Sequence, residues 1–264
     1  MLALIAGAGA LPGVVARAQE QMPLVCALEG FAPDDLAADL TFRLETLGTL
    51  FAELTERGIR EVCLCGAIRR PPVDPARIDA ATLPLVETLR AAIAAGDDGA
   101  LRAVIGLFET AGFQVRAAVE LVPTLLPEAG VPTIGQPAEQ AVTDAGRAAA
   151  VVKALSGVDV GQGCVVLRGQ VLAIEGVFGT DWMLASLASR PDAGGGVLFK
   201  GAKAGQDRRA DLPTIGPDTV SACAAVGLDG IVIEAGSALV LNLDAVVEAC
   251  NRLGLYLWIR GATG

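Results

Sequence analysis

The sequence predicts an α/β protein with two domains. Short apolar runs suited to buried strands alternate with stretches whose apolar residues recur every three or four positions, as they do in amphipathic helices. A glycine turn, Gly7 to Gly9, follows the first run directly, which is typical of the first strand and helix of a parallel sheet. The segment from Leu126 to Gln140 holds three prolines and two glycines with little apolar periodicity, so we interpret it as the connection between domains.

The first domain, residues 1–130, is expected to be a Rossmann-like parallel sheet. Gly66 ends its third strand, and the turns at Gly7 and Gly66 are expected to offer backbone amides to a nucleotide at the carboxyl edge of the sheet. Arg69 and Arg70 follow that strand. The first turn misses the full GxGxxG spacing by one position, so a turn that only packs a helix on a strand stays open. The predicted strands are 2–6, 23–28 and 59–65, and the predicted helices are 11–19, 47–57, 82–95 and 99–110.

The second domain, residues 137–264, follows a linker at 131–136. Two glycine-bounded runs predict a β-hairpin, and the rest continues the α/β alternation. Thr180 is a candidate N-cap of a short helix. Residues 129–136 and 193–196 carry glycines and few packing residues, so they are candidate hinges. The predicted helices are 141–155, 179–187, 219–226 and 243–253, and the predicted strands are 161–168, 171–175, 197–200, 230–234, 238–241 and 255–259.

Histidine is absent from all 264 residues. This excludes the Ser-His-Asp and Cys-His nucleophile systems, histidine-ligated two-metal phosphoesterases and the HExxH zinc motif. The remaining chemistry uses carboxylates, lysine, arginine, hydroxyls, backbone amides and a hard cation such as Mg²⁺.

The overall composition excludes several further classes. A net charge of −10 argues against a general nucleic-acid binder, which needs a basic face for the phosphates. No apolar run approaches the roughly 20 residues of a membrane span. The first residues lack the basic region of a signal peptide, so we expect a cytoplasmic protein. The six cysteines lie mostly among apolar residues without CxxC spacing, so reduced core cysteines are expected.

Cations, carboxylates, an amide and glycines crowd together between Lys200 and Gly216, KGAKAGQDRRADLPTIG. Two of the three lysines of this acidic chain lie here. A site that cleaves a phosphate anhydride needs cations for the oxygens and carboxylates for a divalent metal. Asp207 and Asp211 supply the carboxylates. The alternative is a solvated loop of mixed charge.

Further short segments run along the chain: GAGALP at 7–12, GDD at 96–98, DVGQ at 159–162, EGVFGTD at 175–181, Lys203 with QDRR at 206–209, and DLPTIG at 211–216. In this order and spacing they resemble the LpxI family, the UDP-2,3-diacylglucosamine pyrophosphatases of bacterial lipid A synthesis. The resemblance covers the chain nearly from end to end. Ala204 departs from family members that carry Lys-Pro at this point, which concerns the stiffness of the loop more than its chemistry.

The resemblance implies a nucleotide-binding Rossmann-like domain, a lipid-binding α/β domain and an active site in the cleft between them. It implies Mg²⁺-dependent hydrolysis of UDP-2,3-diacylglucosamine to UMP and 2,3-diacylglucosamine 1-phosphate (lipid X), with water attacking the phosphorus on the sugar side. It also suggests a homodimer. The expected partners are this lipid-nucleotide substrate and the lipid X product, with no nucleic acid. Because no segment is long enough to span a bilayer, we expect peripheral contact with the cytoplasmic face of the inner membrane, with the acyl chains received by an apolar cavity of the second domain.

The resemblance and the residue chemistry together assign roles. Asp211 is expected to be the catalytic carboxylate that binds metal or holds the attacking water, and Glu175 to be a second metal ligand. Cationic side chains would neutralise the pyrophosphate oxygens, and neighbouring polar groups would orient metal or water. The other expected catalytic residues are Lys203, Gln206, Asp207 and Arg209. The expected substrate-binding residues are Gly7, Gly9, Leu11, Gly66, Lys200, Gln162, Thr180 and Asp181.

Two functions from other classes stay open at this point. One is a nucleotide-sugar binding protein without catalysis, which the presence of Asp211 disfavours. The other is a nicotinamide-dependent oxidoreductase, which the spacing of the glycine turn disfavours. A thermal shift with UMP and Mg²⁺, but not with pyridine nucleotides, would distinguish these readings.

Overall fold

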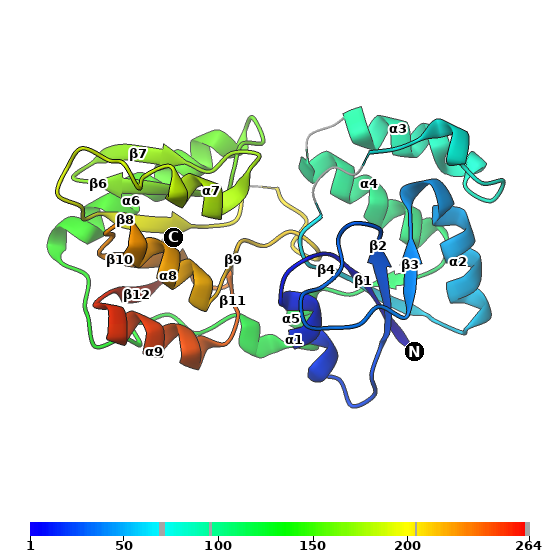
Figure 1. Cartoon of the computed structure of the whole chain (residues 1–264), viewed down its shortest axis with the longest axis horizontal. Coiled ribbons are helices and arrows are strands. Elements are labelled where there is room, and N and C mark those ends of the chain that lie inside the picture. Colours follow the sequence, from blue (N-terminus) through cyan, green and yellow to red (C-terminus); the bar gives the residue numbers. More distant parts are fainter. Residues whose placement is uncertain (69–71, 95–96, 204, 262–264) are drawn as a thin grey trace. The chain divides into compact units, whose positions relative to one another are not determined.

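The computed structural model describes residues 1–68, 72–94, 97–203 and 205–261 (Figure 1). They form two compact units, so the expected two-domain α/β organisation is confirmed. Unit 1 comprises Met1–Pro123 with Asp207–Asp211, and unit 2 comprises Thr124–Gln206 with Leu212–Gly264. Four residues named in the sequence analysis lie outside the described residues: Arg69, Arg70, Gly96 and Ala204.

Unit 1 contains a five-stranded parallel sheet in the order β3-β2-β1-β4-β5. This order matches the first five strands of the Rossmann sheet, so the Rossmann-like prediction is confirmed. The last four residues of β1, β2 and β4 are buried in each case, as expected of strands covered on both faces. The strands are β1 Leu2–Ala6, β2 Leu24–Leu28, β3 Leu40–Phe42, β4 Glu61–Cys65 and β5 Gln114–Val115.

Helices cover both faces of the unit 1 sheet. On one face, Phe51 of α2 and Phe108 of α4 pack edge to face with ring centroids 4.8 Å apart, within the apolar core. The helices α1 and α5 contact β1 and β4, and Figure 1 shows them across the sheet from α2. The helices are α1 Leu11–Arg17, α2 Leu47–Glu56, α3 Val86–Ala94, α4 Asp97–Thr110 and α5 Ala118–Leu121. Single 3-10 turns occur at Leu44–Thr46, Pro75–Arg77, Leu83–Leu85 and Pro123–Leu125.

Unit 2 contains a mixed five-stranded sheet in the order β12-β10-β8-β6-β7. The strands β12, β10 and β8 are parallel, and β6 is antiparallel to β8 and β7. The predicted β-hairpin is therefore confirmed as β6 with β7. Buried Asp144 holds its turn, because the carboxylate accepts hydrogen bonds from the amides of Arg168 (2.8 Å) and Gly169 (2.7 Å). The strands are β6 Gly163–Leu167, β7 Gln170–Ile174, β8 Val197–Lys200, β10 Gly230–Glu234 and β12 Tyr256–Arg260, with β9 Thr214–Ile215 and β11 Leu239–Val240 as a separate parallel pair.

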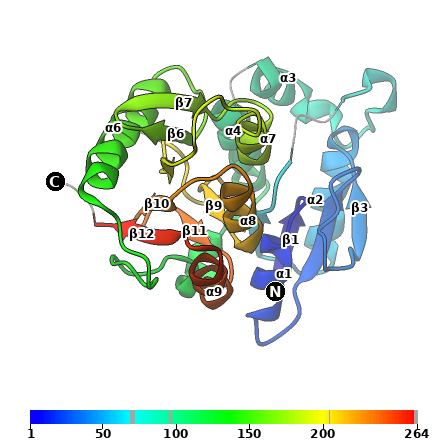
Figure 2. The ribbon, with the colours of Figure 1, turned by 60° about the vertical axis from the view of Figure 1, so that its left-hand side comes forward.

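The helices of unit 2 lie on opposite faces of its sheet. Small residues of α6, including Ala145 and Ala148, pack against one face, whereas α7, α8 and α9 pack against the other (Figure 2). Asn242 caps α9 by accepting a hydrogen bond from the Ala245 amide (3.2 Å), and Gly254 ends this helix with φ of 77°. The helices are α6 Glu139–Ser156, α7 Gly179–Ala185, α8 Pro217–Ala225 and α9 Leu243–Leu253.

The segment predicted as a linker and hinge has contacts of its own in unit 2. Gly130 and Ile259 form an antiparallel bridge with both N···O distances at 2.9 Å. The hydroxyl of buried Thr133 accepts a hydrogen bond from the Leu257 amide at 3.1 Å. These bonds tie the segment to β12, so it is better packed than its glycines and prolines indicated. The boundaries at 130 and 137 stay predictions.

Unit 1 is discontinuous, because the chain returns to it for Asp207–Asp211. Ala210 packs against the apolar core of unit 1, and Arg209 Nη1 donates to Glu109 Oε1 of α4 at 2.5 Å. From the sequence, residues 137–264 are expected to form the second domain, and no local pattern indicates this return of the chain to unit 1.

The cysteines lie in the interior. All six are free and buried, which confirms the prediction of reduced core residues. Burial raises the pKa of Cys26 and of Cys164 to about 12, so both thiols are unreactive at neutral pH. Among the described residues, no helix combines the length and the hydropathy needed to cross a bilayer.

Candidate active site

The expected site residues are divided between the two units. Unit 1 carries Gly7, Gly9, Leu11, Gly66, Asp207, Arg209 and Asp211, whereas unit 2 carries Gln162, Glu175, Thr180, Asp181, Lys200, Lys203 and Gln206. Three of the residues expected in the second domain, Asp207, Arg209 and Asp211, thus lie in unit 1.

The turns after β1 and β4 meet at the carboxyl edge of the parallel sheet. A Cβ on Gly7 would lie 2.6 Å from the carbonyl oxygen of Ala67, and a Cβ on Gly66 would lie 2.6 Å from that of Gly7. Gly66 also has φ of 92°, which disfavours any side chain. This edge lies between β1 and β4, where the strand order reverses and where α/β proteins bind ligands. The glycines allow the two loops to approach at that point.

The first three amides of the turn after β1 donate within the protein. The Gly7 amide donates to Cys65 at 2.8 Å, and the Ala8 amide donates to Ala67 at 2.9 Å. The Gly9 amide donates to Asp34 Oδ1 at 3.1 Å. These amides are therefore engaged in this conformation, which differs from the phosphate cradle expected from the glycines. Leu11 opens α1 directly after the turn. Nucleotide contacts of Gly7, Gly9, Leu11 and Gly66 stay predictions.

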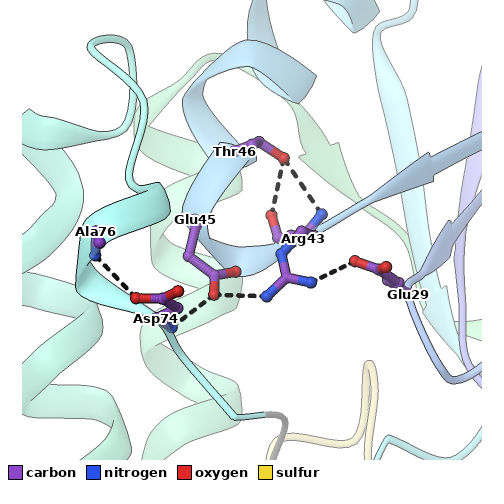
Figure 3. Close-up of polar contacts among 6 residues, drawn as sticks. All are labelled: Glu29, Arg43, Glu45, Thr46, Asp74 and Ala76. Carbon is purple, nitrogen blue, oxygen red and sulfur yellow. Dashed lines mark hydrogen bonds and ion pairs between the residues drawn. The ribbon is translucent and has the colours of Figure 1, made fainter.

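A charge cluster that the sequence analysis missed follows β2 and β3 (Figure 3). The Glu45 side chain is only 2% exposed, and its Oε1 accepts from Arg43 Nη2 (2.9 Å) and from the Asp74 amide (2.7 Å). Arg43 Nη1 also donates to Glu29 Oε2 at 2.5 Å. Burial by itself would raise the pKa of Glu45, but these hydrogen bonds outweigh it and lower the pKa from 4.5 to about 2. The cluster ties the loop at Asp74 to the end of the sheet. The short strand β3 gave no clear pattern from which to find it.

The returning segment of unit 1 is built around Arg209. Asp207 Oδ1 accepts from Arg209 Nε (3.0 Å) and Oδ2 accepts from Nη2 (2.8 Å), so the pair is bidentate. Glu109 binds the remaining Nη1. These hydrogen bonds from Arg209 lower the pKa of Asp207. The Asp211 amide donates to the Asp207 carbonyl at 3.2 Å, so half-buried Asp211 lies one turn further along. Both Asp207 oxygens serve Arg209 rather than a metal in this arrangement.

A buried polar cluster in unit 2 joins residues from three segments. Lys200 Nζ at the end of β8 lies 3.3 Å from Glu175 Oε1 and donates to the Thr180 hydroxyl at 2.5 Å. Thr180 donates in turn to Glu175 Oε1 (2.6 Å), and the Gln162 amide donates to Glu175 Oε2 (3.1 Å). Burial favours the neutral form of Glu175, but the charge of Lys200 and these hydrogen bonds lower its pKa. The structure therefore brings four expected site residues together, with Glu175 as the counter-ion of Lys200.

The glycines of the sequence around Gln162 make this cluster possible. A Cβ on Gly161 would lie 2.1 Å from the Glu175 carbonyl oxygen, and a Cβ on Gly163 would lie 3.1 Å from Glu175 Oε2. The prediction that Thr180 caps α7 is wrong, because Phe178 is the N-cap residue and Thr180 turns inward to Glu175. Asp181, the next residue, is exposed in the first turn of α7.

A second cluster of unit 2 surrounds Lys203. Its ammonium lies 2.5 Å from Asp159 Oδ1, and the lysine side chain is only 8% exposed. The Lys203 amide donates to Gln206 Oε1 at 2.9 Å. Gln206 is buried, and its Nε2 has no hydrogen-bond partner within the described part of the chain. A buried amide nitrogen without an acceptor is uncommon, so Gln206 is suited to donate to a ligand oxygen.

The described residues contain no group of three or more His, Cys, Asp or Glu side chains arranged to hold a metal. A hollow of about 610 Å³ lies beside α9, but none of the expected site residues lines it. Its lining includes Asp244, Glu248 and Arg252, so it does not match the apolar cavity expected for acyl chains. The expected catalytic and charged binding residues lie instead in or beside the clusters around Lys200, Lys203 and Arg209.

Comparison with known proteins decides the family. Family models for the LpxI N-terminal domain and the LpxI C-terminal domain match residues 1–125 and 128–258. A curated relative from Caulobacter vibrioides is 37% identical over 271 residues, which cover 97% of this chain and 96% of the relative. The chain belongs to the LpxI family. That relative is named UDP-2,3-diacylglucosamine pyrophosphatase LpxI, so the resemblance identified from the sequence is confirmed. Membership in the LpxI family argues against the oxidoreductase reading.

Proposed function

We propose that this chain hydrolyses the pyrophosphate of UDP-2,3-diacylglucosamine to UMP and 2,3-diacylglucosamine 1-phosphate, lipid X, in lipid A biosynthesis. The observation that carries the proposal is end-to-end similarity to a relative named for this activity. The absence of histidine is compatible with it, since phosphoryl transfer depends mainly on positioning and charge neutralisation. Unit 1 would bind the nucleotide half and unit 2 the acylated sugar phosphate.

We propose that Asp211 orients the attacking water. It is half-buried, and its amide fixes it to the turn that Asp207 and Arg209 stiffen. A carboxylate held in this way can orient water toward the phosphorus on the sugar side. The bond between that phosphorus and the bridging oxygen then breaks, and UMP leaves.

The residues of the candidate site fit a divalent cation that is held by one carboxylate of the protein. Mg²⁺ is usually held by one or two carboxylates together with substrate phosphates and water, rather than by a cage of protein ligands. Asp211 is proposed as that carboxylate because it lies in the turn held by Arg209, and Glu175 accepts hydrogen bonds from Lys200, Thr180 and the Gln162 amide. When bound, Mg²⁺ would neutralise charge on the pyrophosphate oxygens. We therefore retain Asp211 as the proposed ligand and assign Glu175 to orienting Lys200.

The two lysine clusters of unit 2 are proposed to bind the sugar phosphate. Lys200 donates to two protein oxygens, and a lysine ammonium carries three hydrogens. Gln206 Nε2 offers a further donor, beside Lys203. These groups would hold phosphate oxygens while the nucleotide is bound elsewhere, and so supply orientation at the reacting phosphorus.

The test is incubation of the purified full-length protein with UDP-2,3-diacylglucosamine in ¹⁸O-labelled water. We expect UMP and lipid X, with the label in lipid X, and loss of activity in EDTA that Mg²⁺ restores. Label in UMP would overturn the assignment of the attacked phosphorus. A folded protein that forms neither product with Mg²⁺ present would overturn the proposed function itself.

We also infer that the protein associates peripherally with the cytoplasmic face of the inner membrane, because the proposed substrate carries two acyl chains. Dilution without detergent should release the protein from membranes, and a requirement for detergent would contradict this inference. The homodimer suggested by the resemblance is a separate prediction. Analytical ultracentrifugation of the full-length protein checks it.

A further inference from the structure

Six large apolar side chains of unit 2 are exposed on two loops, one before β6 and the other between β7 and α7, and on the elements that flank the second loop, since Ile174 ends β7 and Trp182 lies in α7. Their exposed fractions run from 37% at Val160 to 76% at Val177. Single exposed apolar residues are ordinary, but a gathered set marks an interaction surface. The members of this 158–182 face are Val158, Val160, Ile174, Val177, Phe178 and Trp182.

The two loops are held against each other by the backbone around Glu175. The Glu175 amide donates to the Gly163 carbonyl at 2.9 Å, and the Gln162 amide donates to the Glu175 side chain at 3.1 Å. The rings of Phe178 and Trp182 contact each other with centroids 5.3 Å apart, although they are 57% and 59% exposed. The face is therefore a fixed surface of the fold.

One segment supplies both this face and part of the buried polar cluster. Along residues 174–182, Glu175 and Thr180 turn inward to Lys200, whereas Val177 and Phe178 are exposed. An amphiphile has the same two-sided chemistry, with a charged head and apolar chains. The apolar face thus adjoins the groups proposed to hold the head of such a molecule.

We propose that the 158–182 face docks on the surface of a lipid bilayer. This rests on the proposed function, since a diacylated substrate resides in the bilayer. Exposed Trp and Phe with aliphatic neighbours are the side chains that settle at a membrane interface. Asp181 is exposed between Phe178 and Trp182, and the protein carries a net charge of −10. Attraction to anionic lipid is therefore not the source of binding, and docking is apolar and only weakly dependent on salt.

A second copy of the chain fits this face less well. A stable protein–protein interface needs roughly 20–30 residues a side. Six apolar side chains would form only a small part of such an interface, and exposed Asp181 lies among them, whereas a small apolar anchor is enough for reversible contact with a bilayer.

The test compares wild type with the double variant Phe178→Ser and Trp182→Ser. The matched control is Ile134→Ser, which removes an 83% exposed side chain elsewhere in unit 2. Binding is measured by co-sedimentation with neutral phosphatidylcholine vesicles at low and high salt. Hydrolysis is measured with UDP-2,3-diacylglucosamine embedded in those vesicles and, separately, dispersed in detergent. Thermal unfolding of the three proteins checks that all are folded.

We expect vesicle binding by wild type and control, and a drop of about tenfold or more in the double variant, because two aromatic side chains no longer leave water. Hydrolysis of vesicle-embedded substrate should fall in parallel, while hydrolysis in detergent is unchanged. In a Trp258→Phe background, emission from Trp182 should shift to the blue when vesicles are added.

Three results would overturn the proposal. The first is equal co-sedimentation of wild type and double variant. The second is an equal loss of hydrolysis in detergent, which would assign the face to the acyl chains of the substrate. The third is a wild-type dimer that the double variant dissociates, with no vesicle binding. If wild type binds vesicles but hydrolyses neither form of substrate, the proposed function fails while the docking result stands.

Discussion

Two buried carboxylates, Glu45 in unit 1 and Glu175 in unit 2, have similar partners but different surroundings. Each carboxylate accepts hydrogen bonds from a backbone amide and from a cationic side chain, and each has a lowered pKa. Arg43, the partner of Glu45, is 23% exposed and also binds the exposed carboxylate of Glu29. Lys200, the partner of Glu175, is 7% exposed and is otherwise bound by a neutral hydroxyl.

The difference indicates separate roles for the two clusters. The arginine has two carboxylate partners that offset its charge, although its buried Nε has no hydrogen-bond partner among the described residues, and the cluster acts as a tie between loops. The lysine has one carboxylate and a spare hydrogen in a buried setting, where a phosphate oxygen would interact strongly with it. We therefore assign stability to the Glu45 cluster, and both stability and binding to the Glu175 cluster.

The largest expected effect comes from Lys200→Met. This change leaves Glu175 buried without its counter-ion, which should cost about 3–5 kcal/mol of unfolding free energy. Urea denaturation at neutral pH measures it. The double variant with Glu175→Gln should recover part of the loss, because the uncompensated charge is then removed. If the single and double variants were equally unstable, the ion pair would not be the reason.

Asp211→Ala sharpens the comparison, because Asp211 belongs to neither buried cluster. We expect near wild-type stability and a fall in kcat of several hundredfold, since loss of one strong transition-state contact costs about 3–4 kcal/mol of barrier. Turnover assays beside thermal unfolding test both parts. Asp218→Ala, in the first turn of α8, is the control for loss of an acidic residue seven positions further along the chain. Near wild-type turnover of Asp211→Ala would remove this carboxylate from the mechanism.

The Glu45 cluster should govern stability in acid. The pKa of Glu45 is about 2 in the folded protein and 4.5 is the usual value, so its contribution is present above pH 4.5 and is lost as the pH falls toward 2. Glu45→Gln replaces a charged acceptor with a neutral one and should cost about 1 kcal/mol per hydrogen bond at neutral pH. Its unfolding free energy should therefore fall less than that of wild type between pH 5 and pH 3. If the unfolding free energies of wild type and Glu45→Gln fell equally between pH 5 and pH 3, the role given to Glu45 would be contradicted.

The smallest expected effect is that of Glu109→Gln. This half-exposed carboxylate holds only Nη1 of Arg209, while Asp207 retains Nε and Nη2. Stability should change by less than about 1 kcal/mol. Because the variant loosens the segment that carries Asp211, a modest fall in kcat with unchanged KM is expected, and steady-state kinetics measure it. A change confined to KM would point to a role in substrate binding instead.

Local pattern was enough to find the long elements. Strand 197–200, strand 230–234 and helix 243–253 were predicted with their observed bounds, because burial and capping leave clear signals there. The strands β3 and β5, of three and two residues, were missed because such short runs show no period. The family could be identified because its motifs are spread along the whole chain.

The pairs of side chains that contact each other in the candidate site could not be predicted from local sequence pattern. The sequence placed Glu175 and Lys200 among the candidates, but it contains nothing that pairs two residues 25 positions apart. The same holds for Arg209 and Glu109, which are 100 positions apart. Such pairs depend on which strands become neighbours. The same long-range order places Asp207–Asp211 with unit 1, which no local pattern of the sequence indicates.

The return of the chain to unit 1 has a consequence for synthesis on the ribosome. Residues up to Pro123 emerge first, but Ala210, Arg209 and the rest of that segment complete the unit only when residue 211 has been made. At about 5–20 residues per second the delay is on the order of ten seconds. During this time the nascent first unit lacks the Ala210 side chain, which packs against its core, and the carboxylate proposed for catalysis. A partial chain that ends before residue 207 thus carries most of unit 1 but lacks Asp211, so, if the role proposed for Asp211 holds, hydrolysis begins only when synthesis is nearly finished.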